Sequence, residues 1–573
     1  MTDLLRDTFF GHCVRLATGN KYFQYYEESH PEEWERYVDR EKSANLAHHG
    51  SVEPEKRQQR NNSNGGEAEY RNSASSSQTQ VADYDASDKQ ASNEKADPEK
   101  GRDITLISWN GPDDPENPQN WSRPKKYFVT FELCLLTLSI YIGSAIYTAG
   151  IQGVMMQFGV SQVAATLGLT LFVAGYGLGP MLWSPMSEVP QVGRTPIYIL
   201  TLAVFVIFQV PTALAKNFGM LLAFRFLTGF FGSPVLATGG ASIGDMYRPK
   251  KRVYAMAVWG VAAVCGPTLG PLVGGFAAES EGWTWTIWEL MWLSGFCLVF
   301  LIFLLPETSS NNILYRRTRR LRKLTGNESL KCEPELMGEQ MSGNDIVNMI
   351  LVKPFTLNFT EPMVFLLNLY IALVYGLLYI WFESFPIVFI GIYNFTLGEL
   401  GLAFLGILIG ALATIPFYFL WIYFVHEKQF DDAGNVKPEK RLQPACVGAF
   451  FIPICLFWFG WSSRPSIHWI MPIIGSGFFS VGTLLLFNAV LNYLADVYVD
   501  NVASVLAGND LMRSAFGAGF PLFAGAMFRN LGVGWASSLL GFLSIVFIPI
   551  PFALYFYGET LRKKHSKIAR KDI

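Results

Sequence analysis

Long apolar runs repeat along most of this 573-residue chain and limit what it can fold into. Each run has about 17–25 residues, enough to cross a hydrocarbon core of roughly 30 Å as a helix. Because no water is available there, backbone hydrogen bonds must be satisfied within each helix or within a closed barrel, and the runs lack the period-two alternation of barrel strands. The twelve runs are residues 127–149, 164–184, 197–215, 219–241, 254–277, 286–305, 363–384, 400–425, 446–461, 469–494, 504–527 and 534–557.

The charge content supports the same interpretation. The chain has Lys+Arg 45 and Asp+Glu 47, so only 16% of its residues are charged, against roughly 25% in soluble domains. Many of these charges lie in residues 1–126, which leaves the remainder still more apolar. So few charges cannot cover a large apolar body in water, and the near-neutral total offers no basic face for nucleic acid. The sequence therefore predicts a membrane protein with a polar tail and no nucleic-acid partner.

The runs fall as six plus six about a polar loop, which predicts an all-α polytopic membrane protein. Twelve transmembrane helices in two six-helix halves place a substrate site between the halves, near the midplane. The tract from about Lys42 to Asp103 is rich in Ser, Asn, Gln and charge, and is predicted to be disordered. The predicted parts are a largely disordered N-terminal tail (1–126), a six-helix half (127–305), a central loop (306–362), a second half (363–557) and a C-terminal tail (558–573).

The positions of Lys and Arg predict the orientation, because cytoplasmic loops carry an excess of both. One side of the predicted bundle holds most of them, including the cluster at 316–323, whereas the other side offers only Lys216, Arg464 and Arg529. Both termini and the central loop are therefore expected in the cytoplasm. The sequon at Asn394 falls on the outer side and is a glycosylation candidate.

The sequence contains no GxxxxGK[ST] motif, and its central loop is too short for a nucleotide-binding domain. Transport driven directly by ATP is therefore not expected, which leaves ion-coupled or facilitated transport by a protein that is not an enzyme. The seven cysteines are scattered, with no close pair, so neither a metal site nor a redox motif is predicted.

The segment GYGLGPMLWSPMSEVPQVGRTPIY, residues 175–198, joins the second and third runs. Gly193 and Arg194 are predicted to form a turn that places a cation at a helix end, where Glu188 can pair with it or sit at a helix N-terminus. We interpret this segment as a conformational gate in preference to an ordinary positive loop. Asp245, at the end of the fourth run, is predicted to be a cap or gate partner.

Arg225 lies deep in the fourth run, within RFLTGFFGSP. A charge at this depth is costly unless it faces a partner or a wet cavity. The functional hypothesis is a proton-coupling or substrate-side cation that changes partner during transport. The alternative is a static buried pair that holds two helices together.

The fifth run contains GVAAVCGPTLGPLVGG, with two successive GPxxG-type units. Its glycines, with Gly275 included, are predicted to form one smooth helix face for close packing. The prolines break the hydrogen-bond ladder and permit bending. The motif residues are Gly260, Gly266, Pro267, Gly270, Pro271 and Gly274.

Tyr375, Tyr379 and Glu383 are spaced four residues apart in the seventh run and share one helix face. Such a stripe is a candidate substrate cavity for an apolar or cationic compound. The alternative is an aromatic belt at the membrane interface, with Glu383 among the headgroups. Glu132 is a weaker candidate for a role in coupling. Asp510 and Arg513 are i,i+3 neighbours and are expected to pair with each other.

Three motifs together, GYGLGP…WSPMSE…GRTPIY, RFLTGFFGSPVLATGGASIGDM and CGPTLGPLVGG, resemble the major facilitator superfamily, specifically its fungal twelve-span drug:proton antiporters. WNGPDDPENPQNWS and LLRDTFFGH are similar to the branch of azole- and benomyl-resistance pumps. The resemblance implies that Arg225 couples protons, that Gly266, Pro267 and Gly270 support the antiport cycle, and that Gly193 and Arg194 belong to the gate.

The resemblance also implies a plasma-membrane exporter of lipophilic or amphipathic xenobiotics, such as azoles and other fungicides. Its energy source would be the proton gradient, with no cofactor, and a monomer is expected to suffice. Alternatives are a dedicated exporter of an endogenous toxin, secondary metabolite or polyamine, an importing symporter, and a nutrient sensor that does not transport. Polyamine transport would need several inward carboxylates, and the sequence offers few besides Glu383.

Overall fold

The computed structural model describes residues 5–30, 32, 34, 37–38, 94–96, 103–339, 347–431, 436–566 and 568–569. The chain divides into two compact units. The larger comprises Met1–Gln24, Trp109–Arg316 and Pro334–Ile573, and the smaller comprises Tyr25–Ser108 and Arg317–Glu333. The tract from about Lys42 to Asp103, predicted to be disordered, lies outside the described residues except for 94–96 and 103.

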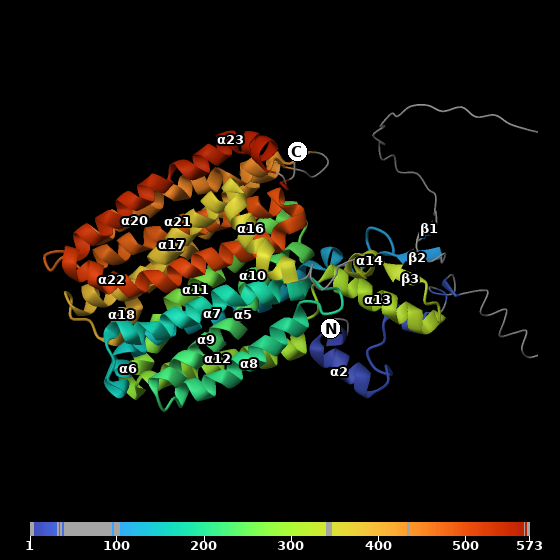
Figure 1. The fold of residues 1–573 in the computed structure, drawn as a ribbon, viewed down its shortest axis with the longest axis horizontal. Coiled ribbons are helices and arrows are strands. Elements are labelled where there is room, and N and C mark those ends of the chain that lie inside the picture. The colour runs from blue at the N-terminus through green and yellow to red at the C-terminus, as the bar shows by residue number, and fades with distance from the viewer. Residues whose placement is uncertain are drawn as a thin grey trace, which may run out of the picture. The chain divides into compact units, whose positions relative to one another are not determined.

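The first half of the larger unit consists of long helices that run side by side (Figure 1). Side chains fix where several begin: Ser161 accepts a hydrogen bond from the Ala164 N–H at 3.3 Å, and Asn217 accepts one from the Met220 N–H at 2.8 Å. The helices are α5 (Arg123–Ala145), η4 (Ile146–Gly150), α6 (Ile151–Phe158), α7 (Gln162–Glu188), α8 (Thr195–Ala213), α9 (Phe218–Gly232), α10 (Pro234–Met246), α11 (Pro249–Glu281) and α12 (Trp283–Leu304).

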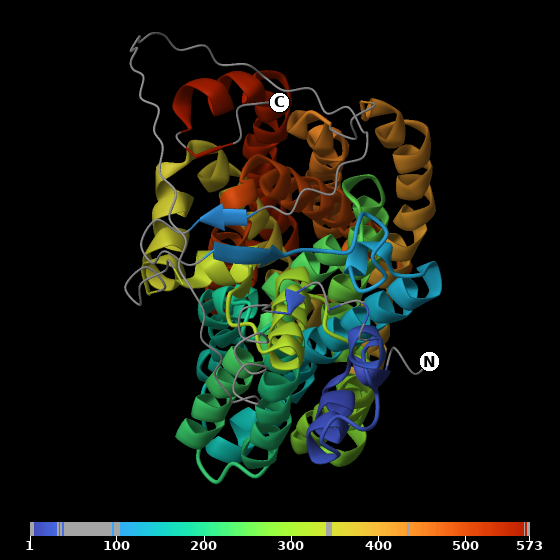
Figure 2. The same ribbon diagram turned by 90° about the vertical axis from the view of Figure 1, so that its right-hand side faces the viewer.

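The second half lies against the first, and two views at right angles show the two sets of helices on opposite sides of the bundle (Figures 1 and 2). Helix α17 begins with a proline. N–H groups in the first turn of a helix have no carbonyl partner within that helix, so a proline there loses no hydrogen bond. The helices are α16 (Lys353–Thr360), α17 (Pro362–Phe385), α18 (Leu397–Ala403), α19 (Leu405–Phe424), α20 (Gln443–Ser462), α21 (Ile470–Val497), α22 (Val502–Phe547) and α23 (Pro549–His565), with short turns η5 (Asn348–Val352), η6 (Pro386–Ile390), η7 (His426–Gln429), η8 (Pro438–Leu442) and η9 (Val499–Asn501).

The described part of the chain contains 11 helical stretches that are long and apolar enough to cross a membrane. The last stretch, Ser504–Lys564, has 61 residues and would extend about 90 Å as one straight helix, three times the hydrocarbon thickness. It is interrupted at Gly532, where φ is 74° and ψ is 159°. This break lies between the predicted runs 504–527 and 534–557.

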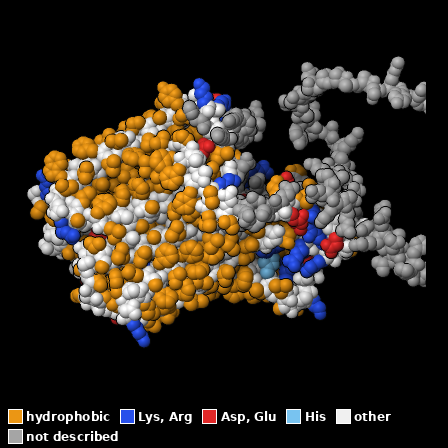
Figure 3. Space-filling model, viewed as in Figure 1, with side chains coloured by type: hydrophobic (Ala, Val, Ile, Leu, Met, Phe, Trp, Pro, Cys, Tyr) orange, Lys and Arg blue, Asp and Glu red, His pale blue; other side chains and the backbone are white. Residues whose placement is uncertain are grey.

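The flank of the bundle is apolar, as hydrocarbon requires (Figure 3). Large hydrophobic side chains stand out from the protein surface there, including Ile207 at 63%, Phe417 at 73% and Val546 at 70% exposure. In water such a surface would mark an aggregating protein. Facing lipid, it costs nothing, which agrees with the predicted membrane protein.

Parts of the predicted N-terminal tail and central loop are structured. Helix α2 (Phe9–Ala17) belongs to the larger unit, where Phe10 and Phe303 of α12 have ring centroids 4.9 Å apart. The smaller unit holds a three-stranded sheet in the order β1 (Glu94–Ala96), β2 (Asp103–Ile107) and β3 (Leu330–Cys332), antiparallel and then parallel. Helices α13 (Ser310–Thr325) and α14 (Glu333–Glu339) flank β3 in the chain.

Helices α7 and α9 cross closely because glycines occupy the contact. A Cβ on Gly229 would overlap the backbone of Phe172, and a Cβ on Gly175 would overlap the backbone of Phe226. The crossing therefore excludes even alanine, and it sets the position of α9, which carries Arg225.

Substituting Gly229→Ala should destabilise the first half by about 1–3 kcal/mol, because overpacking forces the backbones apart. Gly519→Ala is the matched control, since a Cβ there meets nothing within 4 Å. Apparent melting temperatures of the detergent-solubilised variants check this prediction. Equal melting temperatures for the two variants would contradict the proposed crossing.

Candidate functional site

A cavity between the two halves opens among the charged ends of the helices. We call the end where α7 finishes and α8 begins the basic end, and the end where α7 begins and α17 finishes the distal end. The basic-end cavity has a volume of about 450 Å³. Its lining comes from α7, α10 and α11 of the first half and from α21 and α22 of the second.

Every arginine that lines the basic-end cavity is paired with a carboxylate. Arg194 lies 3.0 Å from Asp245, Arg252 lies 2.6 Å from Asp496, and Arg513 donates to Asp510 at 2.6 Å. The pair of Arg252 with Asp496 joins α11 to α21 and therefore connects the two halves. The wall of the cavity is therefore charged, but the carboxylates of these three aspartates are all paired with arginines.

The predicted gate loop is held by a carboxylate that the sequence did not single out. Glu307 accepts hydrogen bonds from the backbone N–H groups of Arg194 at 3.1 Å and Thr195 at 3.2 Å. It also accepts from the N–H groups of Thr308 and Ser309 at 3.0 and 2.9 Å. Its position directly after an apolar run was the available signal, but its partners in the gate loop, Arg194 and Thr195, lie more than one hundred residues away.

Gly193 turns the gate loop with φ of 79°, and a Cβ there would lie 2.5 Å from Glu307 Oε2. Arg194 pairs with Asp245, as expected for a gate partner, whereas Glu188 is exposed and lines the cavity. Burial by itself would lower the pKa of Arg194, but nearby carboxylates, led by Asp245, outweigh it and hold that pKa above its ordinary value. Arg194 therefore stays charged at any physiological pH.

Four hydroxyl groups meet at mid-height, where the two halves touch. We call Ser144, Tyr176, Tyr375 and Tyr379 the hydroxyl cluster. Tyr176 bonds to Tyr375 and, at 2.7 Å, to Tyr379, which donates to Ser144 at 3.0 Å. Because Tyr176 and Ser144 belong to the first half, this cluster closes the cavity with polar contacts across the seam.

The structure brings two of the three predicted cavity residues together and separates the third. Tyr375 lines a narrow extension of about 60 Å³, beside Trp259 and Arg513, that shares these two residues with the basic-end cavity. Glu383, two helical turns beyond Tyr375, lines a different cavity of about 100 Å³ at the distal end. Tyr176 was missed, although a tyrosine in the middle of an apolar run was a visible signal.

Arg225 is fully buried and is held without a carboxylate. Its Nε donates to the Gly168 carbonyl and its Nη1 to the Gly143 carbonyl, both at 3.0 Å. The guanidinium carbon lies 4.7 Å from the Tyr147 ring and 4.3 Å from the Phe172 ring. Among the described residues Arg225 forms no ion pair, and its partners are backbone carbonyls and aromatic rings.

The glycines of α11 do not share one face. Gly266, Gly270 and Gly274 face α5 and its continuation, where added Cβ atoms would meet Tyr141, Ala145 and Ile146. Gly260 instead faces Asn488 of α21, and Gly275 faces the carbonyl of Leu397, the first residue of α18. The prediction of one smooth face was wrong for these two, because an advance of about 100° per residue turns them toward the second half.

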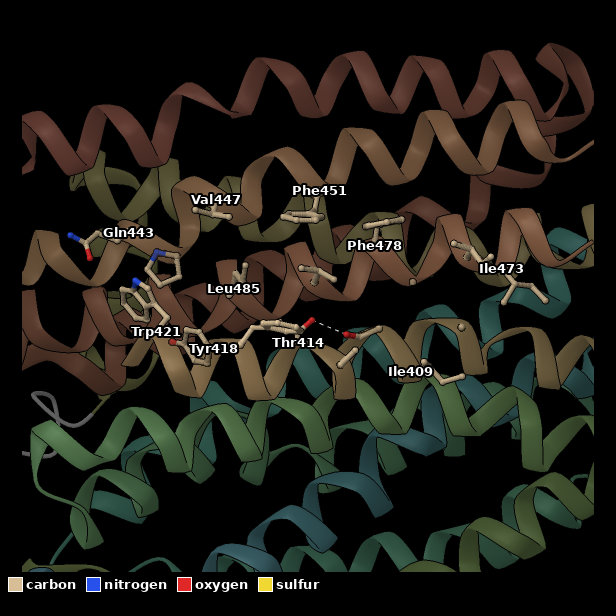
Figure 4. A pocket seen from close by; sticks show the side chains of 18 of the residues that line it. Ile409, Thr414, Tyr418, Trp421, Gln443, Val447, Phe451, Ile473, Phe478 and Leu485 are labelled. Atoms are coloured by element: carbon tan, nitrogen blue, oxygen red, sulfur yellow. Dashed lines mark hydrogen bonds between the residues drawn. The ribbon is translucent and has the colours of Figure 1, made fainter. Parts of the chain in front are cut away.

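A second, larger hollow of about 660 Å³ lies apart from the central seam, among α19, α20 and α21. Figure 4 shows its side chains, such as Phe451, Phe478 and Ile473, pointing into the groove between these helices. Phe417 on its rim is exposed on the lipid-facing flank. This groove shares no lining residue with the basic-end cavity.

Two further candidates occupy distinct environments. Asn394 is exposed in the turn before α18, with φ of 58°, and is accessible as a glycosylation candidate. Glu132 is fully buried in α5, and within the described part of the chain neither of its carboxylate oxygens has a hydrogen-bond partner.

The bundle has a cavity between two halves, charged residues at one end and an apolar flank. This is the architecture of a multi-pass membrane transporter rather than an enzyme. The chain belongs to the Major Facilitator Superfamily, whose family pattern matches residues 133–518. It is 39% identical to the cycloheximide resistance protein of Candida maltosa over 99% of this chain and 100% of that protein. It is 42% identical to fluconazole resistance protein 1 of Saccharomyces cerevisiae over 80% of this chain and 84% of that protein.

The fold is also similar to a solved structure, a partially occluded inward open conformation of the xylose transporter XylE from E. coli. The TM-score is 0.52 at 15% identity, and the match covers 75% of this chain and 99% of that chain. This likeness concerns the fold alone. Together, the relatives confirm the predicted resemblance to the fungal drug-resistance branch of the superfamily.

Glu307→Ala should destabilise the gate loop by about 3 kcal/mol, because several buried N–H groups lose their acceptor and each costs about 1–3 kcal/mol. Glu281→Ala is the control, since Glu281 is exposed at the end of α11. Thermal unfolding of the solubilised variants measures the difference. A Glu307 variant as stable as the Glu281 variant would show that Glu307 does not hold this loop.

Proposed function

We propose that this transporter is a proton-coupled multidrug exporter of the plasma membrane. It takes lipophilic or amphipathic compounds, such as azoles and other fungicides, from the cytosol or the inner leaflet. The observation that carries the proposal is the basic-end cavity between the two halves. Paired charges line this cavity, and aromatic residues line the extension next to it. The names of the drug-resistance relatives support the same substrate class.

The proposal includes twelve spans, because the break at Gly532 divides the last apolar stretch into two crossings. An even number of spans leaves both termini on one side. The excess of Lys and Arg at the basic end supports the cytoplasm as that side. Substrate would then enter the basic-end cavity from the cell interior.

The chemistry of the cavity suits varied lipophilic compounds better than polyamines. Trp259, Tyr375 and Phe487 supply contact that is not directional, which tolerates different shapes. The aspartates on its wall, Asp245, Asp496 and Asp510, are each engaged by an arginine. Apart from the single exposed carboxylate of Glu188, a polycation would have to displace these pairs, whereas a lipophilic compound need not.

Proton exchange is the proposed energy source, with no cofactor and with a monomer as the working unit. The membrane potential supplies about 2.3 kcal/mol per charge per 100 mV to such a cycle. Arg225 is proposed to support coupling through its position, since it joins α5, α7 and α9 by hydrogen bonds to two backbone carbonyls. A separate carboxyl group must then carry the proton.

Accumulation of a panel of labelled fungicides in a pump-deficient yeast tests the function. Cells that express the chain should retain less of several unrelated compounds, and a protonophore should abolish the difference. An effect confined to one compound would indicate a dedicated exporter, and no effect on any compound would contradict drug export.

Arg225→Ala should reduce efflux roughly tenfold or more, the effect of about 1.4 kcal/mol on a barrier, while the protein still reaches the membrane. Arg225→Lys should not restore it, because a lysine lacks the fork that reaches two carbonyls. Arg464→Ala, at a distal loop where Arg464 lies over the Trp461 ring, is the control. Unchanged efflux in the Arg225 variants would refute a role in coupling.

A further inference from the structure

The distal end of the seam is closed around a single carboxyl group. Glu383 of α17 is 5% exposed, and both of its oxygens contact α7 of the opposite half. Among the residues that line the distal cavity of about 100 Å³, it is the one that can titrate. We propose that Glu383 is a proton-binding residue of the transport cycle and that the closed distal seam is the state in which it holds its proton; this inference rests on the proposed proton-coupled export.

The hydrogen-bond geometry around Glu383 accommodates a neutral carboxyl group. Gln162 Nε2 donates to Glu383 Oε2 at 3.1 Å. Thr166 Oγ1 lies 3.2 Å from Glu383 Oε1 and 3.0 Å from its own helix carbonyl at Gln162. A hydroxyl group has one hydrogen, so Thr166 can give it to that carbonyl and accept the proton of Glu383. Every group then has a donor matched to an acceptor.

An ionised Glu383 fits the same site less well. Thr166 can donate to the carboxylate only by giving up its side-chain bond to the Gln162 carbonyl, which still accepts the helical N–H of Thr166. The negative charge would also be buried without a direct ion pair within the described residues, and such a charge is costly in a bundle surrounded by lipid. Loss of the proton therefore favours separation of α17 from α7, which admits water.

The charged groups around this seam do not neutralise Glu383 directly. Arg529 of α22 is exposed and donates to Gln162 Oε1 at 3.0 Å rather than to the carboxylate. The lining residues contributed by η4, α6, α11 and α18 are uncharged, among them Thr148, Gln152 and Pro271. On α17 itself, Tyr379 lies one turn away and is bonded within the hydroxyl cluster.

This assignment gives the proton a place in the cycle. With the distal end open, Glu383 takes a proton from the external solution, and its neutral form permits the seam to close. The basic-end cavity is then the accessible one, as it is in this structure.

The test measures opening of the distal seam without measuring transport. Thr148→Cys introduces a thiol into the wall of the distal cavity, and a membrane-impermeant maleimide added outside intact cells reports its exposure. Thiolate reactivity itself rises with pH, so the quantity compared is the ratio of labelling rates with Glu383 intact and with E383Q. The amide of E383Q mimics the neutral carboxyl group, donating to Thr166 and accepting from Gln162.

As external pH rises past the titration of Glu383, this ratio should increase by up to about tenfold per pH unit, because one proton is released on opening. E399Q is the matched control. Glu399 lies in α18 at the same end, is exposed, and accepts a hydrogen bond from the Thr396 N–H at 2.9 Å. Its labelling should follow that of the intact chain.

A ratio that does not change with pH would overturn the assignment of Glu383. Efflux measured in the same cells separates this outcome from failure of the proposed function. If the intact chain shows no protonophore-sensitive efflux, the proposed proton-coupled export is contradicted. If efflux is normal but the labelling ratio does not depend on pH, only the assignment of Glu383 as a proton-binding residue is contradicted.

Discussion

Charges that enter the bundle must be neutralised inside it, because the surrounding hydrocarbon supplies no water, and the structure depends on how each one is met. Arg225 is met by two backbone carbonyls and two aromatic rings, which fixes α5, α7 and α9 as one body. Arg194 and Arg513 are met by aspartates. Glu383 and Glu132 are the contrasting cases: Glu383 contacts uncharged side chains of the opposite half, and the carboxylate oxygens of Glu132 have no hydrogen-bond partner among the described residues. That difference separates groups that hold each half together from a group suited to change state.

The kind of contact between the two halves changes along the seam. At the basic end, Arg252 and Asp496 form an ion pair, at mid-height the hydroxyl cluster supplies neutral hydrogen bonds, and at the distal end Glu383 bonds to α7. When the helices separate, water can replace these polar contacts between the halves. Two interdigitated apolar faces would resist the same separation. The glycines of α11 that face α5 make the first half compact, while Gly275 allows α18 to approach. Two stiff halves with an exchangeable seam are what alternating access requires.

The predicted apolar runs coincide with helical stretches because hydrophobic length is a local property. The described part of the chain has 11 such stretches where twelve runs were predicted, and the break at Gly532 in the last stretch falls between two of those runs. Arg225 was found for the same reason, as a charge inside an apolar run. Its environment was not predictable, since Gly143 and Gly168 lie far away in the chain. Glu307 was missed because its function is to accept hydrogen bonds from residues more than one hundred positions earlier. Tyr375 and Glu383 share a helix face, but only the opposite half decides that they line different cavities.

Proton antiport is the central claim, and the most direct measurement is proton flux in proteoliposomes that contain the purified chain and a pH-sensitive dye in their lumen. With no initial pH gradient, a lipophilic fungicide that moves down its own gradient through the protein should drive protons in the opposite direction. The account predicts a change in lumenal pH that depends on both substrate and protein and that disappears with a protonophore. Movement of the fungicide through the protein without any proton flux would contradict it.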